Sequence, residues 1–151
     1  HNNFYFAGVF HGAFIFDNDT ISDPYYGGTV HEDMFIFKMR SNGQQLWLKQ
    51  FKSSLQVKPN GMAIDGNTLL SFNFAQANID LLNDTTLPYS QPGSFIYRTD
   101  TLGMSRDMIK FYEFPNAMGL YYPFSSPIYL NEAQQEAGIG FLYKTNFIDE
   151  K

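Results

Sequence analysis

The chain has 151 residues, of which 44% are hydrophobic and 18% aromatic but only 17% charged, and this composition excludes a disordered chain. A net charge of −5 with ten scattered basic residues excludes a cationic surface for a nucleic-acid backbone, so no nucleic-acid partner is expected. The lack of cysteine excludes disulfides, thiolate zinc sites and a cysteine nucleophile. No apolar run approaches the roughly 20 residues of a membrane helix, and the length suits one domain.

The first predicted strand, Asn3–Phe10, has apolar residues at alternate positions on both faces, which is typical of a strand buried on both sides. A second apolar run, Ala13–Phe16, ends at Asp17-Asn18-Asp19, and such side chains favour turns because they bond to their own backbone. Residues 22–29, with one proline and two glycines, then predict a loop.

Residues 34–39 predict the next strand, and Ser41-Asn42-Gly43 predicts a hairpin because Asn-Gly tolerates the positive φ of a type I′ turn. Residues 45–48 form its second strand. Alternation places Trp47 on the face opposite Leu46 and Leu48, and we expect Trp47 to be largely buried between packed sheets.

The second half of the chain repeats this plan. Residues 61–64 predict a strand, Asp65-Gly66-Asn67 a tight turn, and residues 68–74 the counterpart of residues 4–10. In this alignment Phe74 matches Phe10, Leu102-Gly103 replaces Asn42-Gly43, and Met108 replaces Trp47. Helix-favouring composition occurs only at residues 131–137, a stretch that is compatible with one helical turn but is too short and too near a repeat turn to predict a helix.

Three related segments mark the repeat: 35–40 (FIFKMR), 95–100 (FIYRTD) and 141–146 (FLYKTN). They divide residues 1–151 into one array of units at about 2–51, 56–111 and 112–151, with the first and last units incomplete. The predicted fold is all-β, with antiparallel β-meander repeats stacked as propeller-like blades of an incomplete propeller. A two-sheet β-sandwich built from the same hairpins is the alternative. Unpaired sheet edges then favour protein partners or self-association.

The first unit resembles the β-propeller repeat of secreted bacterial proteins. The segments that carry the resemblance are NFYFAG (3–8), DMFIFK (33–38), SNG (41–43) and LWLKQF (46–51). It is best over residues 2–51 and weaker in the internal copies at 56–111 and 112–151. The resemblance implies export to the cell surface and a binding or scaffold role, and specifies no reaction. Because the chain begins at His1 rather than Met, we expect a mature or excised fragment.

Three carboxylates in one short stretch, Asp17, Asp19 and Asp23, are weak candidates for a calcium site, since calcium prefers oxygen ligands. A solvated turn is the favoured interpretation, because the spacing does not fit a helix-loop-helix calcium loop. His11, His31, Glu32 and Asp33 provide imidazole and carboxylate groups, but His11 matches Ala75 and Ser125 in the other units, so a polar loop entering a strand is expected there. No cofactor and no catalytic residue are predicted.

Tyr25 and Tyr26 follow Pro24 in the predicted loop and are speculative ligand-binding residues. Thr20, Thr85 and Thr101 each follow an aspartate, in segments that resemble an Asp-Thr-apolar O-glycosylation acceptor of some Gram-negative bacteria. The same dipeptide also suits turns. The predicted function is a non-catalytic binding or scaffold segment of an exported or cell-surface bacterial protein. A carbohydrate-binding or carbohydrate-active module, with a glycan as ligand, is the alternative.

Overall fold

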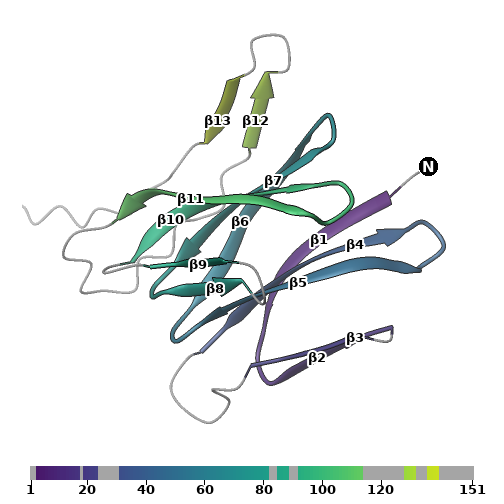
Figure 1. The fold of residues 1–151 in the computed structure, drawn as a ribbon, viewed down its shortest axis with the longest axis horizontal. Coiled ribbons are helices and arrows are strands. Elements are labelled where there is room, and N and C mark those ends of the chain that lie inside the picture. Colours follow the sequence, from purple (N-terminus) through teal and green to yellow (C-terminus); the bar gives the residue numbers. More distant parts are fainter. Residues whose placement is uncertain are drawn as a thin grey trace, which may run out of the picture.

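The computed structural model describes residues 3–17, 19–23, 31–81, 85–88, 92–113, 128–131 and 136–139. In these residues the regular structure is β-strand, and every pair of neighbouring strands is antiparallel (Figure 1). The prediction of an antiparallel all-β fold is therefore confirmed. Within the same residues no helix has the length and apolar character needed to cross a membrane.

Two larger sheets make up most of the structure. The first sheet contains, in spatial order, β1 (Asn3–Phe10), β4 (Asp33–Arg40), β5 (Gln45–Ser53), β8 (Ile79–Leu81) and β9 (Thr85–Leu87). The second sheet contains β11 (Ser105–Glu113), β10 (Gly93–Asp100), β7 (Thr68–Ala75) and β6 (Val57–Asp65). Two separate hairpins complete the described strands: β2 (Ala13–Phe16) with β3 (Asp19–Ser22), and β12 (Ile128–Asn131) with β13 (Glu136–Ile139). The strand β12 contacts β6 of the second sheet.

One hydrophobic core fills the space between the two sheets. Met34, Ile36 and Phe51 of the first sheet pack against Phe95 and Tyr97 of the second, and all five are buried. The ring of Phe51 lies 4.9 Å from that of Tyr97 in an edge-on arrangement, which is a favourable geometry for aromatic pairs. Face-to-face packing of this kind fits both the two-sheet alternative and two neighbouring blades. The described residues form no closed propeller.

One hairpin joins the sheet of the other unit. In sequence β8 and β9 lie between β7 and β10 of the second sheet, but β8 pairs with β5 of the first sheet. Leu81 lies opposite Phe51, Asp80 opposite Lys52 and Ile79 opposite Ser53. Because Ile79 and Leu81 point into the common core, the second unit supplies the outer strands of the first sheet.

Two hairpin turns have the same geometry in the two units. Gly43 and Gly103 both have φ of +90°, and the N–H groups of these glycines donate to the carbonyls of Arg40 and Asp100, each at 3.0 Å. Among the described non-glycine residues only Asp17 has a positive φ. Asn42 is therefore not in the left-handed region, and the predicted type I′ turn is wrong, because such a turn needs positive φ at both central residues.

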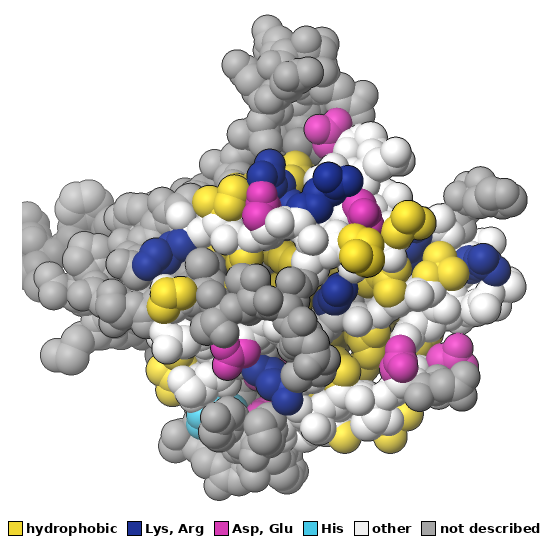
Figure 2. Space-filling view, viewed as in Figure 1, with side chains coloured by type: hydrophobic (Ala, Val, Ile, Leu, Met, Phe, Trp, Pro, Cys, Tyr) yellow, Lys and Arg dark blue, Asp and Glu magenta, His cyan; other side chains and the backbone are white. Residues whose placement is uncertain are grey.

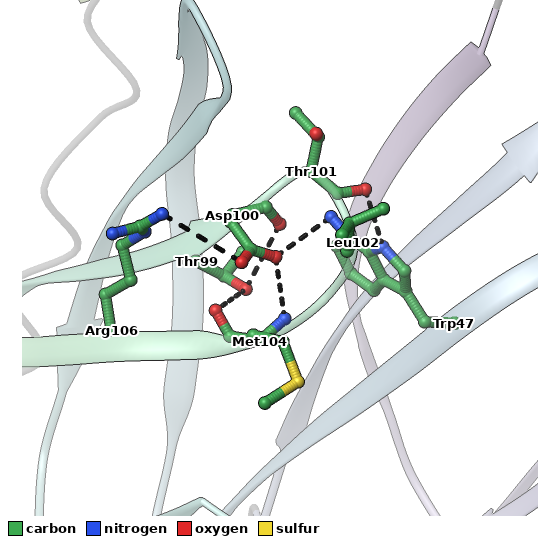
Figure 3. A network of polar contacts seen from close by, with 7 residues as sticks. All are labelled: Trp47, Thr99, Asp100, Thr101, Leu102, Met104 and Arg106. Atoms are coloured by element: carbon green, nitrogen blue, oxygen red, sulfur yellow. Dashed lines mark hydrogen bonds and ion pairs between the residues drawn. The ribbon is translucent and has the colours of Figure 1, made fainter.

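The side chain of Asp100 explains why Leu102 can replace Asn42. Asp100 Oδ1 accepts hydrogen bonds from the backbone N–H groups of Leu102 and Met104, both at 2.9 Å (Figure 3). In the first unit Asn42 Oδ1 accepts from Gln44 N at 3.1 Å. The turn thus retains a side-chain acceptor, which has moved from the turn itself to the end of the preceding strand.

The β10–β11 turn contacts Trp47 of the first sheet. Trp47 Nε1 lies 3.4 Å from the Thr101 carbonyl (Figure 3). The same carbonyl accepts a hydrogen bond from Lys38 Nζ. Trp47 lies opposite Lys38, while Leu48 lies opposite Phe37, so the predicted alternation is confirmed for Trp47 and Leu48. Leu46 lies at an irregularity of the register, between the partners of Lys38 and Met39. Trp47 is partly rather than largely buried, because it lies at the end of the core beside the β10–β11 turn.

Strand register corrects two details of the repeat alignment. Phe10 lies opposite Asp33, whereas Ala75, not Phe74, lies opposite Gly93, which is the counterpart of Asp33. A shift of one residue moves every side chain to the other face. In the same way Asp107 lies opposite Arg98 as Trp47 lies opposite Lys38, so Asp107 and not Met108 holds the place of Trp47.

The third unit lies mostly outside the described residues. At the ends of the stretch with helix-favouring composition, Asn131 ends β12 and Glu136 begins β13, while residues 132–135 lie outside the described residues. This hairpin follows the same part of its unit as β2–β3 does in the first unit. It forms a two-stranded sheet of its own, whereas β8 extends the first sheet.

Candidate functional site: the outer aromatic face of the first sheet

The first sheet has a second apolar face, turned away from the core. Strand alternation places Phe4, Phe6 and Phe10 of β1 on this side, and the register places Phe35 and Phe37 of β4 beside them. The rings of Phe6 and Phe37 are stacked with centroids 4.9 Å apart. We call these five side chains the outer aromatic face.

The hairpin β2–β3 covers one part of this face. Phe14 stacks on Phe35 with ring centroids 4.4 Å apart, and the ring centroids of Phe16 and Phe37 lie 4.8 Å apart. Figure 1 shows the hairpin on one side of the first sheet and the second sheet on the other. Phe10 and Phe37 are buried beneath or beside these contacts.

The remaining part of the face is open. Phe4 is 48% exposed and Phe6 is 40% exposed, so the prediction that residues 3–10 are buried on both sides is wrong for this face. Hydrophobic side chains also reach the surface elsewhere on the molecule (Figure 2). Adjacent exposed rings on a regular strand differ from such single residues, because together they form a continuous apolar surface.

Gly8 allows the aromatic rings to lie close to β1. It lies opposite Phe35, and a Cβ atom at Gly8 would be 2.7 Å from Phe35 Cζ. The ring of Phe35 therefore lies across the backbone of β1 at a place where any other residue would displace it.

The corresponding face of the second sheet is covered. Phe95 and Tyr97 hold the positions of Phe35 and Phe37 in the repeated segment, and both are fully buried against the first sheet. Ile79 and Leu81 of β8 contribute to that core as Phe14 and Phe16 of β2 contribute to the outer aromatic face. Beside β8 the strand β5 supplies Phe51, and no described residue takes the same place beside β2.

A buried carboxylate closes one end of the outer aromatic face. Asp33 Oδ2 accepts from Gln50 Nε2 at 2.8 Å, and Asp33 Oδ1 accepts from the Ser53 N–H at 3.1 Å. Gln50 Nε2 also donates to the Ser22 carbonyl at 2.7 Å, which ties the end of β3 to β5. Burial raises the pKa of Asp33, although the hydrogen bonds from Ser53 and Gln50 act in the opposite direction.

This raised pKa predicts a pH effect on stability. Above the folded-state pKa the buried charge of Asp33 opposes folding, and this cost is relieved as the pH falls toward the unfolded value of about 4. We expect the free energy of unfolding of the wild type, relative to Asp33→Asn, to rise between neutral pH and about pH 4. Urea unfolding at several pH values measures this difference.

Asp107 gives a control of opposite sign. Its pKa is lowered by the hydrogen bond from Arg98, so its contribution to stability is present above the unfolded pKa of about 4 and is lost as the pH falls below it. The free energy of unfolding of the wild type, relative to that of Asp107→Asn, should therefore fall at acidic pH. If the free energy of unfolding of the wild type relative to Asp33→Asn also falls at acidic pH, the pKa of Asp33 is not raised in the folded state.

The residues near Asp33 serve the junction between the units. Glu32 contacts Lys58 Nζ at 2.6 Å and His11 Nε2 at 3.5 Å, while the Glu32 backbone bonds to Leu55 and Val57. These contacts hold the connection between β5 and β6 against the residue that precedes β4. The arrangement agrees with a polar segment entering a strand, as expected from the sequence.

The calcium candidates do not come together. Asp17 and Asp19 are exposed at the turn of the β2–β3 hairpin, and the Asp19 carboxylate accepts from Gln45 Nε2. Asp23 lies buried beyond the other end of β3, with its N–H donating to the Gly12 carbonyl at 2.6 Å. Four residues of extended chain separate Asp19 from Asp23 by about 13 Å. No group of three potential metal ligands occurs in the part of the chain that the structure describes.

The other predicted site residues are placed as follows. Tyr25 and Tyr26 lie outside the described residues. Thr20 is exposed on β3, Thr85 begins β9, and Thr101 is partly buried in the β10–β11 turn. The outer aromatic face was missed as a site by sequence reasoning. Its signal was present in the aromatic alternation of β1, but the alternation was interpreted as two-sided burial.

Comparisons with known proteins add no assignment. Neither the models of protein families, nor the curated proteins, nor the solved structures gave a match to this chain. The interpretation of the site therefore depends on its own geometry and on the internal repeat.

Proposed function

We propose that this chain is a non-catalytic binding or scaffold segment of an exported or cell-surface bacterial protein, and that the outer aromatic face binds another protein. The observation that carries the proposal is the exposure of Phe4 and Phe6 on a face whose counterpart in the second unit lies under a neighbouring sheet.

The chemistry of the face favours a protein surface as its ligand. Its members are phenylalanines without a polar group, so it offers stacking and apolar contact but little hydrogen bonding. Covering the exposed parts of Phe4 and Phe6 would contribute about 1–3 kcal/mol in total. Such a contribution is useful in an interface that also gains backbone hydrogen bonds or further apolar contacts.

The internal repeat supports a propeller-like interpretation of the two sheets. Neighbouring blades of a propeller pack face to face, as the first and second sheets do around their common core. The resemblance of residues 2–51 to secreted bacterial propeller repeats adds export and a scaffold role. Under this proposal the outer aromatic face is the face of a blade that packs against a neighbouring blade.

A carbohydrate-binding role gains no specific support. It would require Tyr25 and Tyr26 to meet carboxylates in one pocket, and both tyrosines lie outside the described residues. Asp19 and Asp23 lie at opposite ends of β3. Protein binding is the function that the described geometry supports best.

Photo-crosslinking tests this proposal. The photoreactive residue p-benzoylphenylalanine replaces Phe4 in one variant and Leu102 in a control, since Leu102 is 80% exposed in the β10–β11 turn and does not belong to the outer aromatic face. In the cells that produce the protein, irradiation should link position 4 to a protein, with a much lower yield at position 102. Equal yields at the two positions, or none at position 4, would refute a binding role for this face.

A further inference from the structure

We infer that β1 is a dimerisation edge: it pairs antiparallel with β1 of a second copy of this chain, about a two-fold axis at Phe6. The inference goes beyond the proposed function and does not depend on it, because it uses the edge of the first sheet rather than the outer aromatic face. It specifies the partner, the strand and the register of the contact.

The strand β1 ends the first sheet, and its outer side is open. Among the described strands β1 pairs only with β4, while β6 of the second sheet contacts β1, β4 and β5 but pairs with none of them. Asn3 is exposed, and Phe4, Phe6 and Val9 are 48%, 40% and 39% exposed. The side of β1 that is turned away from β4 is therefore accessible to another strand.

The free side of β1 has backbone groups at every second residue. Arg40 N donates to the Gln44 carbonyl at 2.9 Å, and the Arg40 carbonyl accepts from Gly43 N at 3.0 Å, so the backbone groups of Arg40 are directed at β5. Successive residues of a strand direct these groups to opposite neighbours. Those of Met39 are thus directed at β1, and those of Phe4, which lies opposite Met39, at β4. The residues of β1 with N–H and C=O groups on the free side are Asn3, Tyr5, Ala7 and Val9.

The other edges of the two larger sheets are protected against strand addition. The strand β9 has three residues and is followed by Pro88. The strand β6 contains Pro59, which lacks an N–H group, and its register is irregular at this residue. The charged side chains of β11 include Arg106, Asp107 and Lys110. Short length, proline, bulges and charges are the features by which natural proteins prevent pairing at a sheet edge.

The strand β1 has none of these protective features. It is eight residues long and contains no charged residue and no proline, and its register with β4 is regular throughout. The strands of the two small hairpins are only four residues long. Within the described residues β1 is therefore the one long edge that can accept a further strand over its whole length.

The order of the side chains in β1 favours antiparallel pairing of this strand with itself. Its first half carries the rings of Phe4 and Tyr5, and its second half carries Ala7 and Gly8. When Phe6 lies opposite Phe6 of the second copy, Phe4 lies opposite Gly8. Tyr5 then lies opposite Ala7, so each of these two rings meets a small residue. A shift by two residues would place Tyr5 opposite Tyr5 or Ala7 opposite Ala7, and this match would be lost.

The same register also matches the free backbone groups. Asn3 exchanges N–H···O bonds with Val9 of the second copy, and Tyr5 does so with Ala7. A two-fold contact uses the same edge on both partners, so only protected or short edges remain among the described strands. Association should therefore stop at a dimer, in which the outer aromatic faces of the two copies lie side by side on one continuous sheet.

Opposite charges at position 6 test the two-fold axis. Phe6→Lys brings two ammonium groups directly opposite each other, and Phe6→Glu brings two carboxylates together, and like charges in such a pair oppose association. We expect the wild type to sediment as a dimer, each variant alone as a monomer, and an equimolar mixture of the two variants as a dimer. The control Ile109→Lys places a charge on β11 at a side chain of similar exposure, 43%, and should remain dimeric. Circular dichroism verifies that each variant is folded.

Chemical crosslinking tests the register without a change at Phe6, and the chain is suited to it because it contains no cysteine. Asn3→Cys and Val9→Cys chains are mixed and treated with a short bismaleimide. In the dimer the thiols at positions 3 and 9 lie opposite each other, whereas two thiols at the same position are separated by six residues of strand, about 20 Å. The mixed product should therefore exceed the two same-position products together at least about tenfold. Random collision yields the two kinds in equal amounts, and intact mass spectrometry measures them.

The results decide between pairing and its absence. A wild type that remains monomeric at all concentrations, or mixed and same-position products in equal amounts, would overturn the inference. If the Phe6 variants do not fold, the crosslinked products decide alone. The photo-crosslink at position 4 distinguishes this contact from the proposed function: an adduct with a second copy supports pairing of β1, and an adduct with a different protein supports binding at the outer aromatic face.

Discussion

Replacement of Phe51 by Ala is expected to lower the free energy of unfolding by about 3–5 kcal/mol, because it removes a ring from a closed core and leaves a cavity. Phe51 is fully buried and contacts Phe95 and Tyr97 across the two sheets. It also lies opposite Leu81 in the pairing of β5 with β8. Chemical denaturation monitored by circular dichroism measures the change.

The matched control is Phe6→Ala, which removes the same ring from the outer aromatic face. Phe6 is 40% exposed, so we expect a cost below about 2 kcal/mol. Equal costs for the two variants would contradict the placement of the core between the first and second sheets.

Replacement of Gly103 by Ala is expected to destabilise the chain more than Gly43→Ala. Both glycines have φ of +90°, so both variants incur backbone strain of about 1–2 kcal/mol. A Cβ atom at Gly103 would lie 2.7 Å from Trp47 Cγ, whereas nothing lies within 4 Å of one at Gly43. Displacing the indole should add about 1–3 kcal/mol to the cost at Gly103. Denaturant midpoints of the two variants give the comparison.

A double-mutant cycle identifies the cause of that difference. In a Trp47→Ala background the steric conflict is absent, so Gly103→Ala and Gly43→Ala should cost the same within experimental error. A difference that persists without the indole would show that the two turns differ in some other respect than their contact with Trp47.

Much of the local structure was predictable from the sequence. The alternating residues of 3–10 indicated β1, the repeated aromatic segments indicated β4 and β10, and each glycine turn joined the strands that flank it. These features depend on near neighbours along the chain, for which period-two patterns and turn residues are direct signals. The turn type at Asn42-Gly43 was missed because Asn-Gly fits more than one hairpin geometry.

Strand register was not predictable from similarity alone. Phe10 and Phe74 look equivalent in an alignment, but they lie on opposite faces of their sheets because Ala75 is the residue opposite Gly93. Apolar residues occur on both faces of β1 and β7, so the sequence offers little contrast that would fix the register. Bulges, such as the one between Ser94 and Phe95, shift the alignment further.

The open state of the outer aromatic face was also beyond the sequence. Whether Phe4 is covered depends on whether another sheet lies above it, and this is a property of the assembly rather than of β1. The pairing of β8 with β5 is equally non-local, since Leu81 and Phe51 are joined across the whole of β6 and β7. Three residues of strand carry too little pattern to name their partner.

The exchange of β8–β9 between sheets has a consequence for how the chain folds. In an ordinary linear array each repeat forms alone and then stacks on its neighbour, but here the edge of β5 is completed only by residues 79–81. During synthesis the first sheet can therefore be completed only after the second half of the chain has emerged from the ribosome. Residues 3–113 should consequently melt in one cooperative transition, and cutting the chain between β5 and β6 should yield two pieces that do not fold separately.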